Sequence, residues 1–253
     1  MNKKLVFFDL DDTLLKKDKS VSDKTKEVLA LLQRNGHKII IATARNKVMT
    51  LPLRDLLKPD YTIINAGAYI LDSNGNIIRS LEIDKDKTKK LINEITTITS
   101  TVSMQTDDIL YSSDIKDIGP ARVYYDFKDF EGMACYKILA KDIDLELGKK
   151  LGIKYKLDFQ NYFGGRWSRF SHLESTKAKA LEFITNYEKK NLSDTIAFGD
   201  DLGDIEMINI SGIGVAMANG LEEVKKQSKY ICESCEDDGV ARFLDKYFSL
   251  GIY

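Results

Sequence analysis

The chain has 253 residues, 43% of them hydrophobic, which is enough for one large domain or two smaller ones with buried cores. Its 38 basic and 39 acidic residues give a formal net charge of -1, and without a basic excess we expect no nucleic-acid partner. No apolar segment is long enough to span a bilayer, so we expect no membrane partner. Asp9 ends the first apolar run too early for a signal peptide, which favours a cytoplasmic protein. Composition leaves the oligomeric state open.

The cysteines give no disulfide framework, because their number is odd. They are Cys135, Cys232 and Cys235, and the last two have the spacing of half a zinc site or of a redox pair. A zinc site would need further ligands, but the chain has no second such pair and only two histidines, His37 and His172. Ordinary reduced thiols are therefore the better interpretation.

The first predicted element is a strand over residues 5–8, which is too short for a helix core and rich in β-branched and aromatic side chains. Three carboxylates follow it, at Asp9, Asp11 and Asp12. Side chains two apart in an extended chain point the same way, so Asp9 and Asp11 could share one face. A hard cation such as Mg²⁺ would relieve the repulsion between them. The alternative is a polar turn in which the Asp side chains cap the following segment.

A strand–helix–strand unit is predicted next. Ser22 can cap a helix over residues 23–35, and residues 38–43 form a second, wholly apolar strand, as in a parallel sheet. Thr43 ends that strand and is followed closely by Arg45. Binding sites in open α/β sheets form at the carboxyl ends of strands, where a hydroxyl can bind a phosphoryl oxygen. A threonine at a strand end is nevertheless more often structural.

From about residue 81 the pattern changes to short hairpins mixed with helices, which predicts an inserted α+β unit with an antiparallel sheet. Before it we expect a short helix bent or interrupted near Pro52, a strand over residues 61–65 and a hairpin turn over residues 72–76. Residues 164–167 could form the return hinge, and Trp167 is better interpreted as a packed side chain than as one facing a substrate. The elements expected in the insertion are a helix over 84–98 with Leu91, Ile92, Ile95 and Ile98 inward, strands over 101–106, 109–112, 122–127, 134–140 and 154–159, and a helix over 145–151.

The last third of the chain alternates strands and helices again. Lys177 opens a helix over residues 175–189, where a lysine is usually exposed to solvent. A short buried strand then leads through Gly199, which lets the backbone turn tightly, to Asp200 and Asp204, which could face one pocket. The remaining elements expected are a strand over 213–217, a helix over 220–228, a strand over 229–232 and a helix over 237–248.

Four stretches resemble, in order, the signatures of the haloacid dehalogenase (HAD) superfamily of phosphatases. They are residues 9–15, the segment around Thr43, residues 173–181 around Lys177, and residues 199–207. Gly67 and Ala68 are similar to a turn of the Cof-type subfamily, although the asparagine and glycine of that turn are not adjacent here. Ala44 replaces a frequent glycine and Gly203 a usual asparagine, which puts one supporting hydrogen bond in doubt.

The resemblance implies an α/β fold: a Rossmann-like parallel-sheet core with an inserted α+β cap domain of type II. The core would comprise residues 1–81 and 171–253, and the cap residues 82–170.

The resemblance also implies a role for each candidate residue, with Mg²⁺ as cofactor and a small phosphorylated metabolite as substrate. Asp9 would attack phosphorus, and Asp11 would act as general acid and then as general base. The metal site would comprise Asp9, Asp200 and the backbone carbonyl of Asp11, and Asp204 would either ligate the metal directly or orient its water molecules. Thr43, Arg45 and Lys177 would bind the phosphate or the rest of the substrate.

Three other functions remain open. A phosphomutase of the same superfamily would return an isomerised sugar phosphate instead of free phosphate. A glycosyltransferase would explain Asp9 and Asp11 but leaves Thr43, Lys177 and Asp200 unexplained. A non-catalytic ligand-binding or regulatory protein on this scaffold would explain the two departures from the family pattern but not the retained acids.

Overall fold

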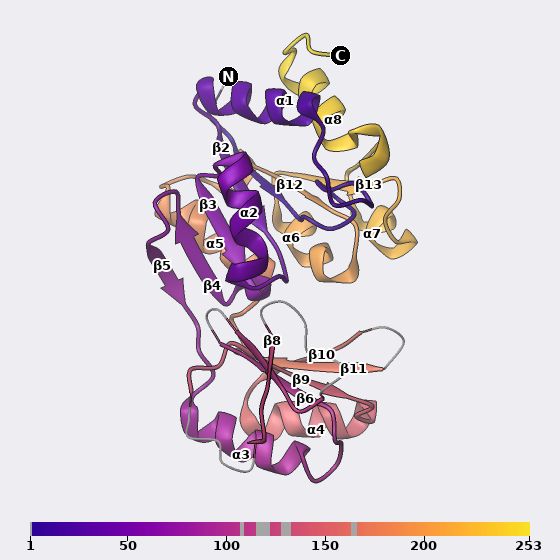
Figure 1. The fold of residues 1–253 in the computed structure, drawn as a ribbon. Helices are drawn as coiled ribbons and strands as arrows, with labels where there is room; N and C mark the ends of the chain where they lie inside the picture. The colour runs from indigo at the N-terminus through magenta and orange to yellow at the C-terminus, as the bar shows by residue number, and fades with distance from the viewer. Residues whose placement is uncertain (1, 107–108, 115–121, 128–132, 163–165) are drawn as a thin grey trace. The chain divides into compact units, whose positions relative to one another are not determined.

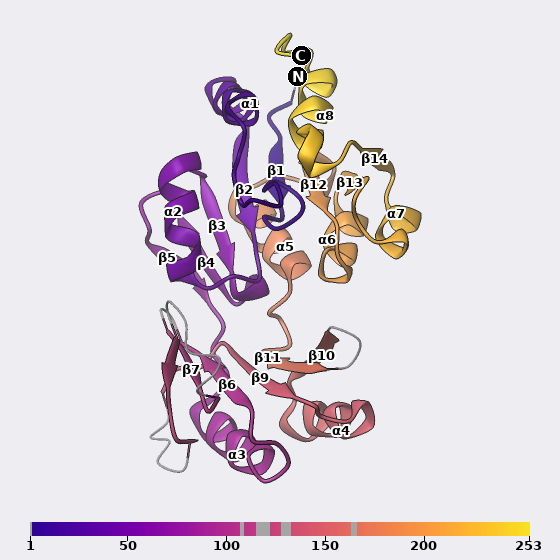
Figure 2. The same ribbon diagram turned by 45° about the vertical axis from the view of Figure 1, so that its right-hand side comes forward.

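The computed structural model describes residues 2–106, 109–114, 122–127, 133–162 and 166–253. By their internal contacts, the residues form two compact units (Figures 1 and 2). The core unit comprises Met1–Ala44, Pro52–Ile78 and Thr176–Tyr253, and the inserted unit comprises Arg45–Leu51 and Arg79–Ser175. The expected α/β core with a separate inserted sheet is therefore confirmed, whereas the domain bounds predicted from the sequence stay a prediction.

Within the described residues, eight strands form the main sheet, and those from β14 to β3 in its order are parallel. β4 runs antiparallel to β3 and leads through the predicted turn over residues 72–76 into β5. In sheet order the strands are β14 (Tyr230–Cys232), β13 (Ile213–Met217), β12 (Thr195–Gly199), β1 (Leu5–Phe8), β2 (Lys38–Ala42), β3 (Tyr61–Ile64), β4 (Tyr69–Asp72) and β5 (Ile77–Ser80).

Helices pack on both faces of this sheet, which explains why β1 is apolar at every position. Val6 and Phe8 of β1 belong to one buried cluster, with residues of α1, α2 and α8, while Leu5 and Phe7 belong to another, with residues of α5 and α6. Ser22 caps α1 as predicted, its hydroxyl accepting from the backbone N of Thr25 at 3.1 Å. The helices are α1 (Asp23–Arg34), α2 (Lys47–Leu57, continuous through Pro52), α5 (Lys177–Tyr187), α6 (Ile205–Ile210), α7 (Glu222–Gln227) and α8 (Gly239–Phe248), with short 3₁₀ turns at Asn65–Gly67, Leu192–Asp194, Leu202–Asp204 and Cys235–Asp237.

The inserted unit carries a second sheet. Two helices pack on one side of this sheet and share a buried hydrophobic cluster with its strands. Its described strands pair antiparallel except for a parallel pair between β7 and β8, so the sheet is mixed. In sheet order the strands are β10 (Asp158–Tyr162), β11 (Trp167–Ser171), β9 (Lys137–Lys141), β6 (Val102–Gln105), β7 (Leu110–Ser112) and β8 (Arg122–Tyr124), and the helices are α3 (Lys85–Ile95) and α4 (Leu145–Tyr155).

Two predictions for elements of the inserted unit are wrong, and one strand was missed. Ile98 is not inward but 42% exposed, because α3 already ends at Ile95. The strand expected over residues 154–159 starts only at Asp158, because α4 continues until Lys156 closes it with a left-handed backbone. Strand β11 was not expected, and part of the proposed hinge over residues 164–167 lies outside the described residues.

None of the helices in the described ranges is long and apolar enough to cross a bilayer. All three cysteines are free and buried. Burial raises the pKa of Cys232 to about 12 and that of Cys135 even further, which keeps both thiols protonated and unreactive at neutral pH.

Candidate active site

The parallel pairing of β1 with β12 brings the two acidic clusters of the sequence together. Phe8 stands opposite Phe198 in the register, so both strands end at the same edge of the sheet. The backbone N of Asp9 donates to the carbonyl of Phe198 at 3.1 Å, which holds Asp9 beside the end of β12. One carboxylate oxygen from each of Asp9, Asp200 and Asp204 lies within 4.8 Å of the others.

Asp204 is oriented by the turn that follows β12. Its Oδ2 accepts from the backbone N of Asp200 at 3.2 Å and of Asp201 at 3.3 Å, and the residue is 1% exposed. A Cβ on Gly199 would lie 2.4 Å from the Cβ of Asp204, so glycine is needed here for close approach. A Cβ on Gly203 would meet nothing within 4 Å, so the missing asparagine leaves open space and Asp204 keeps its place.

Lys177 reaches this cluster from the first position of α5. The Thr176 side chain caps that helix, and the next residue turns its ammonium inward. Lys177 Nζ lies 2.7 Å from Asp9 Oδ1 and 2.6 Å from Asp204 Oδ1, and its side chain is 8% exposed. Lys177 is therefore buried, although a lysine at this position of a helix is usually exposed to solvent.

Burial dominates the electrostatics of the cluster. It raises the pKa of Asp9 to about 8, although Lys177 acts in the opposite direction, and it raises the pKa of Asp200 to about 7, although Thr13 donates to Asp200. Burial would lower the pKa of Lys177, but Asp204 and Asp9 together hold it above its ordinary value. Ionisation of all three carboxyls would thus leave two negative charges beyond the one ammonium that contacts them.

This donor set fits a hard divalent cation. All three groups offer carboxylate oxygens, which suit Mg²⁺, and the ion would balance the excess negative charge that burial penalises. Asp9, Asp200 and Asp204 could therefore hold a metal ion in the core unit.

The structure adds two supporting residues that sequence reasoning passed over. Thr13 is 1% exposed and its hydroxyl donates to Asp200 Oδ1 at 2.7 Å, which orients that carboxylate. A Cβ on Gly220 would lie 2.9 Å from both Cα and the carbonyl O of Asp200, and the Leu221 N donates to the same carbonyl. Thr13 lies within a stretch that resembles a family signature, so the sequence did point to this segment. The threonine was not singled out because its hydroxyl takes no direct part in the expected reaction.

The other predicted site residues have different surroundings. Thr43 is 1% exposed and directly follows β2, which pairs with β1, the strand that precedes Asp9. The Asp11 carboxylate is 39% exposed and pairs with Lys19 at 2.8 Å, so it is not part of the buried acidic cluster. Arg45 belongs to the inserted unit, and its role in binding stays a prediction.

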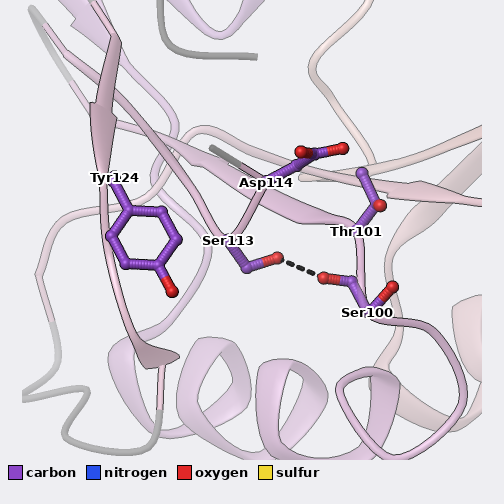
Figure 3. Close-up of a pocket in the computed structure, with 5 residues that line it drawn as sticks. All are labelled: Ser100, Thr101, Ser113, Asp114 and Tyr124. Carbon is purple, nitrogen blue, oxygen red and sulfur yellow. Dashed lines mark hydrogen bonds between the residues drawn. The ribbon is translucent and has the colours of Figure 1, made fainter. Parts of the chain in front are cut away.

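A separate hollow of about 280 Å³ lies in the inserted unit (Figure 3). Its lining is mainly hydroxyls, and the Ser113 hydroxyl donates to the carbonyl of Ser100 at 2.6 Å. None of the five lining residues carries a positive charge, so a phosphate dianion would find no counter-charge among them. They are Ser100, Thr101, Ser113, Asp114 and Tyr124.

Known proteins are similar to this chain in sequence and in fold. A profile of the haloacid dehalogenase-like hydrolase family matches residues 6–244. The chain is 30% identical over 267 residues to the 5-amino-6-(5-phospho-D-ribitylamino)uracil phosphatase YitU of Bacillus subtilis (strain 168), covering 97% of this chain and 98% of that protein. A solved haloacid dehalogenase-like hydrolase from Bacteroides thetaiotaomicron matches with a TM-score of 0.84 at 22% identity, over 97% of this chain and 100% of that one. The solved structure of TM0651 from Thermotoga maritima matches with a TM-score of 0.83 at 25% identity, over 96% of this chain and 97% of that one. The chain therefore belongs to the haloacid dehalogenase-like hydrolase family and is a Cof-type phosphatase.

Proposed function

We propose that this phosphatase hydrolyses a small phosphorylated metabolite, a sugar phosphate or a similar compound, with Mg²⁺ and through an aspartyl-phosphate on Asp9. The observation that carries the proposal is the buried cluster in which Asp9 meets Asp200, Asp204 and Lys177. A carboxylate that attacks a phosphate dianion is repelled by it, so the site needs positive charge close to both groups.

The metal would be held by Asp9, Asp200 and Asp204, with the backbone carbonyl of Asp11 as a further ligand. When bound, Mg²⁺ supplies the positive charge that lets two anions approach each other. Thr13 supports this site because it orients the Asp200 carboxylate through a hydrogen bond.

The protein's own residues would perform the covalent steps. A carboxylate oxygen of Asp9 forms a bond to phosphorus while the ester P–O bond breaks, and Asp11 donates its proton to the leaving oxygen. Asp11 then removes a proton from a water molecule that attacks phosphorus, which releases inorganic phosphate and restores Asp9. The pair between Asp11 and Lys19 would have to open for this exchange, and its half-exposed position makes that possible.

Three residues would bind the phosphoryl group or the rest of the substrate. Lys177 stands in contact with the Asp9 carboxylate and would bind a phosphoryl oxygen beside it. Thr43 would donate its hydroxyl from the end of the neighbouring strand. Arg45 would bind the phosphate or another part of the substrate.

The substrate class is inferred from the family and from the relatives. YitU acts on a phosphorylated ribityl compound, as its name states. At 30% identity we carry over only the general class, a small phosphorylated metabolite, to this chain.

The first test is hydrolysis of p-nitrophenyl phosphate with and without Mg²⁺, followed by a panel of phosphorylated metabolites. We expect free phosphate to appear only when Mg²⁺ is present, and we expect one chemical group of the panel to be hydrolysed fastest. An isomerised sugar phosphate in place of free phosphate would support a phosphomutase. Metabolite binding without turnover would support a non-catalytic protein instead.

A further inference from the structure

The turn at residues 65–67, directly after β3, has no role in the mechanism above. All three residues have a left-handed backbone, with φ of 49° at Asn65, 57° at Ala66 and 111° at Gly67. Residues other than glycine and asparagine rarely adopt this region, so the backbone at Ala66 is strained. The turn is buried, and neither polar atom of the Asn65 carboxamide has a hydrogen-bond partner in the part of the chain that the structure describes. Strain and unsatisfied burial in one short segment indicate a functional constraint on its position.

This turn joins two parts of the candidate active site. On one side, the backbone N of Ala66 donates to the carbonyl of Thr43 at 2.9 Å. On the other side, a Cβ on Gly67 would lie 2.2 Å from the carbonyl O of Thr176 and 2.9 Å from its backbone N. Because backbone atoms cannot move aside as the tip of a side chain can, a larger residue at position 67 would displace the start of α5.

The start of α5 in turn sets the reach of Lys177. Thr176 caps the helix, its hydroxyl accepting from the backbone N of Lys179 at 3.1 Å. Lys177 is the next residue, and it spans the distance to Asp9 and Asp204 with contacts of 2.7 and 2.6 Å. These contacts are at hydrogen-bond distance, so a small shift of the helix start would move the ammonium out of contact with the carboxylates.

We propose that Gly67 is a positioning residue for catalysis: its lack of a side chain lets α5 begin against the end of β3 and so places the Lys177 ammonium at the Asp9 carboxylate. The left-handed backbone at Asn65 and Ala66 brings Gly67 to that place. This inference rests on the proposed function, since it assigns a means of setting the geometry of the same site.

The test compares Gly67→Ala with Gly75→Ala in the full-length protein. Gly75 has φ of 87° in the turn between β4 and β5, and a Cβ there would meet only the Arg54 side chain, at 3.8 Å. Both substitutions place a methyl group on a left-handed residue, but only the first meets the backbone of α5. We expect Gly67→Ala to lower kcat on p-nitrophenyl phosphate by about 10- to 100-fold, with a smaller change in KM. Gly75→Ala should leave both unchanged, and an equal loss in the two variants would overturn the proposal.

A double-mutant cycle separates positioning from a general structural effect. In a Lys177→Met background, Gly67→Ala should lower kcat no further, because the residue through which it acts is gone. Losses that multiply would overturn the proposal. If thermal unfolding shows that Gly67→Ala does not fold, Thr176→Ala is put through the same cycle, because it loosens the same helix start by removing the capping hydroxyl. Its loss of kcat should likewise disappear in the Lys177→Met background, and a loss that persists there would overturn the proposal.

A readout that needs no turnover separates this proposal from the proposed function. The rate at which Lys177 reacts with a small amine reagent, followed by mass spectrometry, should rise in Gly67→Ala and not in Gly75→Ala. Lys179, whose side chain is 39% exposed on the same helix, serves as the internal reference. A wild-type protein without phosphatase activity would refute the function while this labelling still tests the positioning. Equal labelling of Lys177 in both variants would overturn the positioning.

Discussion

The two sheets of this protein differ in how completely the side chains of their strands are buried. In the core unit, every residue of β1 and β3 is buried, because helices cover both faces of the sheet. In the inserted unit, β9 alternates between buried and half-buried residues, and the apolar cluster lies on one side of the strands. Charged groups in the core are therefore concentrated beyond the strand ends, where the acidic cluster lies. Substitutions at the strand ends of the core unit should therefore change catalysis, whereas packing changes in the inserted unit should change stability.

The largest effect should come from Asp9→Asn. The amide cannot attack phosphorus, so we expect the rate on p-nitrophenyl phosphate to fall to less than about one thousandth of wild type. Asp200 and Asp204 remain, so calorimetric titration should still detect Mg²⁺ binding. A rate near that of wild type would show that the acidic cluster of the core unit is not where the chemistry occurs.

Lys177→Met should have the next largest effect. It removes the ammonium that contacts Asp9 and Asp204, so kcat should fall by roughly 10²- to 10³-fold. The buried carboxylates lose their counter-charge, and we expect a loss of about 3–5 kcal/mol in the free energy of unfolding without Mg²⁺. The control is Lys179→Met, which removes a half-exposed ion pair with Glu182 and should cost less than about 1 kcal/mol. Similar results for the two lysines would contradict the assigned role of Lys177.

Gly148→Ala tests the inserted unit. A Cβ there would lie 2.2 Å from the ring of Phe159, so overpacking should lower the free energy of unfolding by about 1–3 kcal/mol. The rate on p-nitrophenyl phosphate should remain near that of wild type. Gly203→Ala, which adds its methyl into open space beside Asp204, should change stability by no more than about 0.5 kcal/mol. Urea unfolding measures both, and a rate loss in Gly148→Ala as large as that of Lys177→Met would remove the distinction between the units.

The last prediction concerns the pH dependence of stability. Folding raises the pKa of Asp9 from 3.8 to about 8 and that of Asp200 from 3.8 to about 7. At pH values between the unfolded and the folded pKa of each group, the folded protein therefore holds more protons than the unfolded chain. The stability of the metal-free protein should therefore decrease as the pH rises from about 4 to about 8, and these groups should cause no further loss above that. Mg²⁺ should stabilise the protein more at pH 8 than at pH 5, since it binds the ionised carboxylates. Urea unfolding of wild type and Asp200→Asn checks this, because the substitution should flatten the pH dependence; an unchanged slope would contradict it.

Most of the core could be predicted from the sequence because its signals are local. The apolar runs that became β1 and β2, the Ser22 cap and the alternation of strands and helices each depend on a few neighbouring residues. The inserted unit was harder. α4 ends at Tyr155 and is capped by Lys156, which has a left-handed backbone. Because lysine does not favour this conformation, the sequence did not indicate where the helix ends, and the predicted start of the following strand was wrong.

For the candidate site, residue types and their spacing along the chain indicated Asp9, Asp200 and Asp204, whereas Lys177 received a role only from the resemblance to the family. Their meeting depends on the parallel register between β1 and β12 and on where α5 begins, which pair residues far apart along the chain. The same long-range contacts give Gly199 its role against Asp204 and bring Gly67 against Thr176. The sequence shows which ionisable groups the chain has and in which order. Burial raises the pKa of Asp9 and Asp200, and this burial arises only when distant segments pack together.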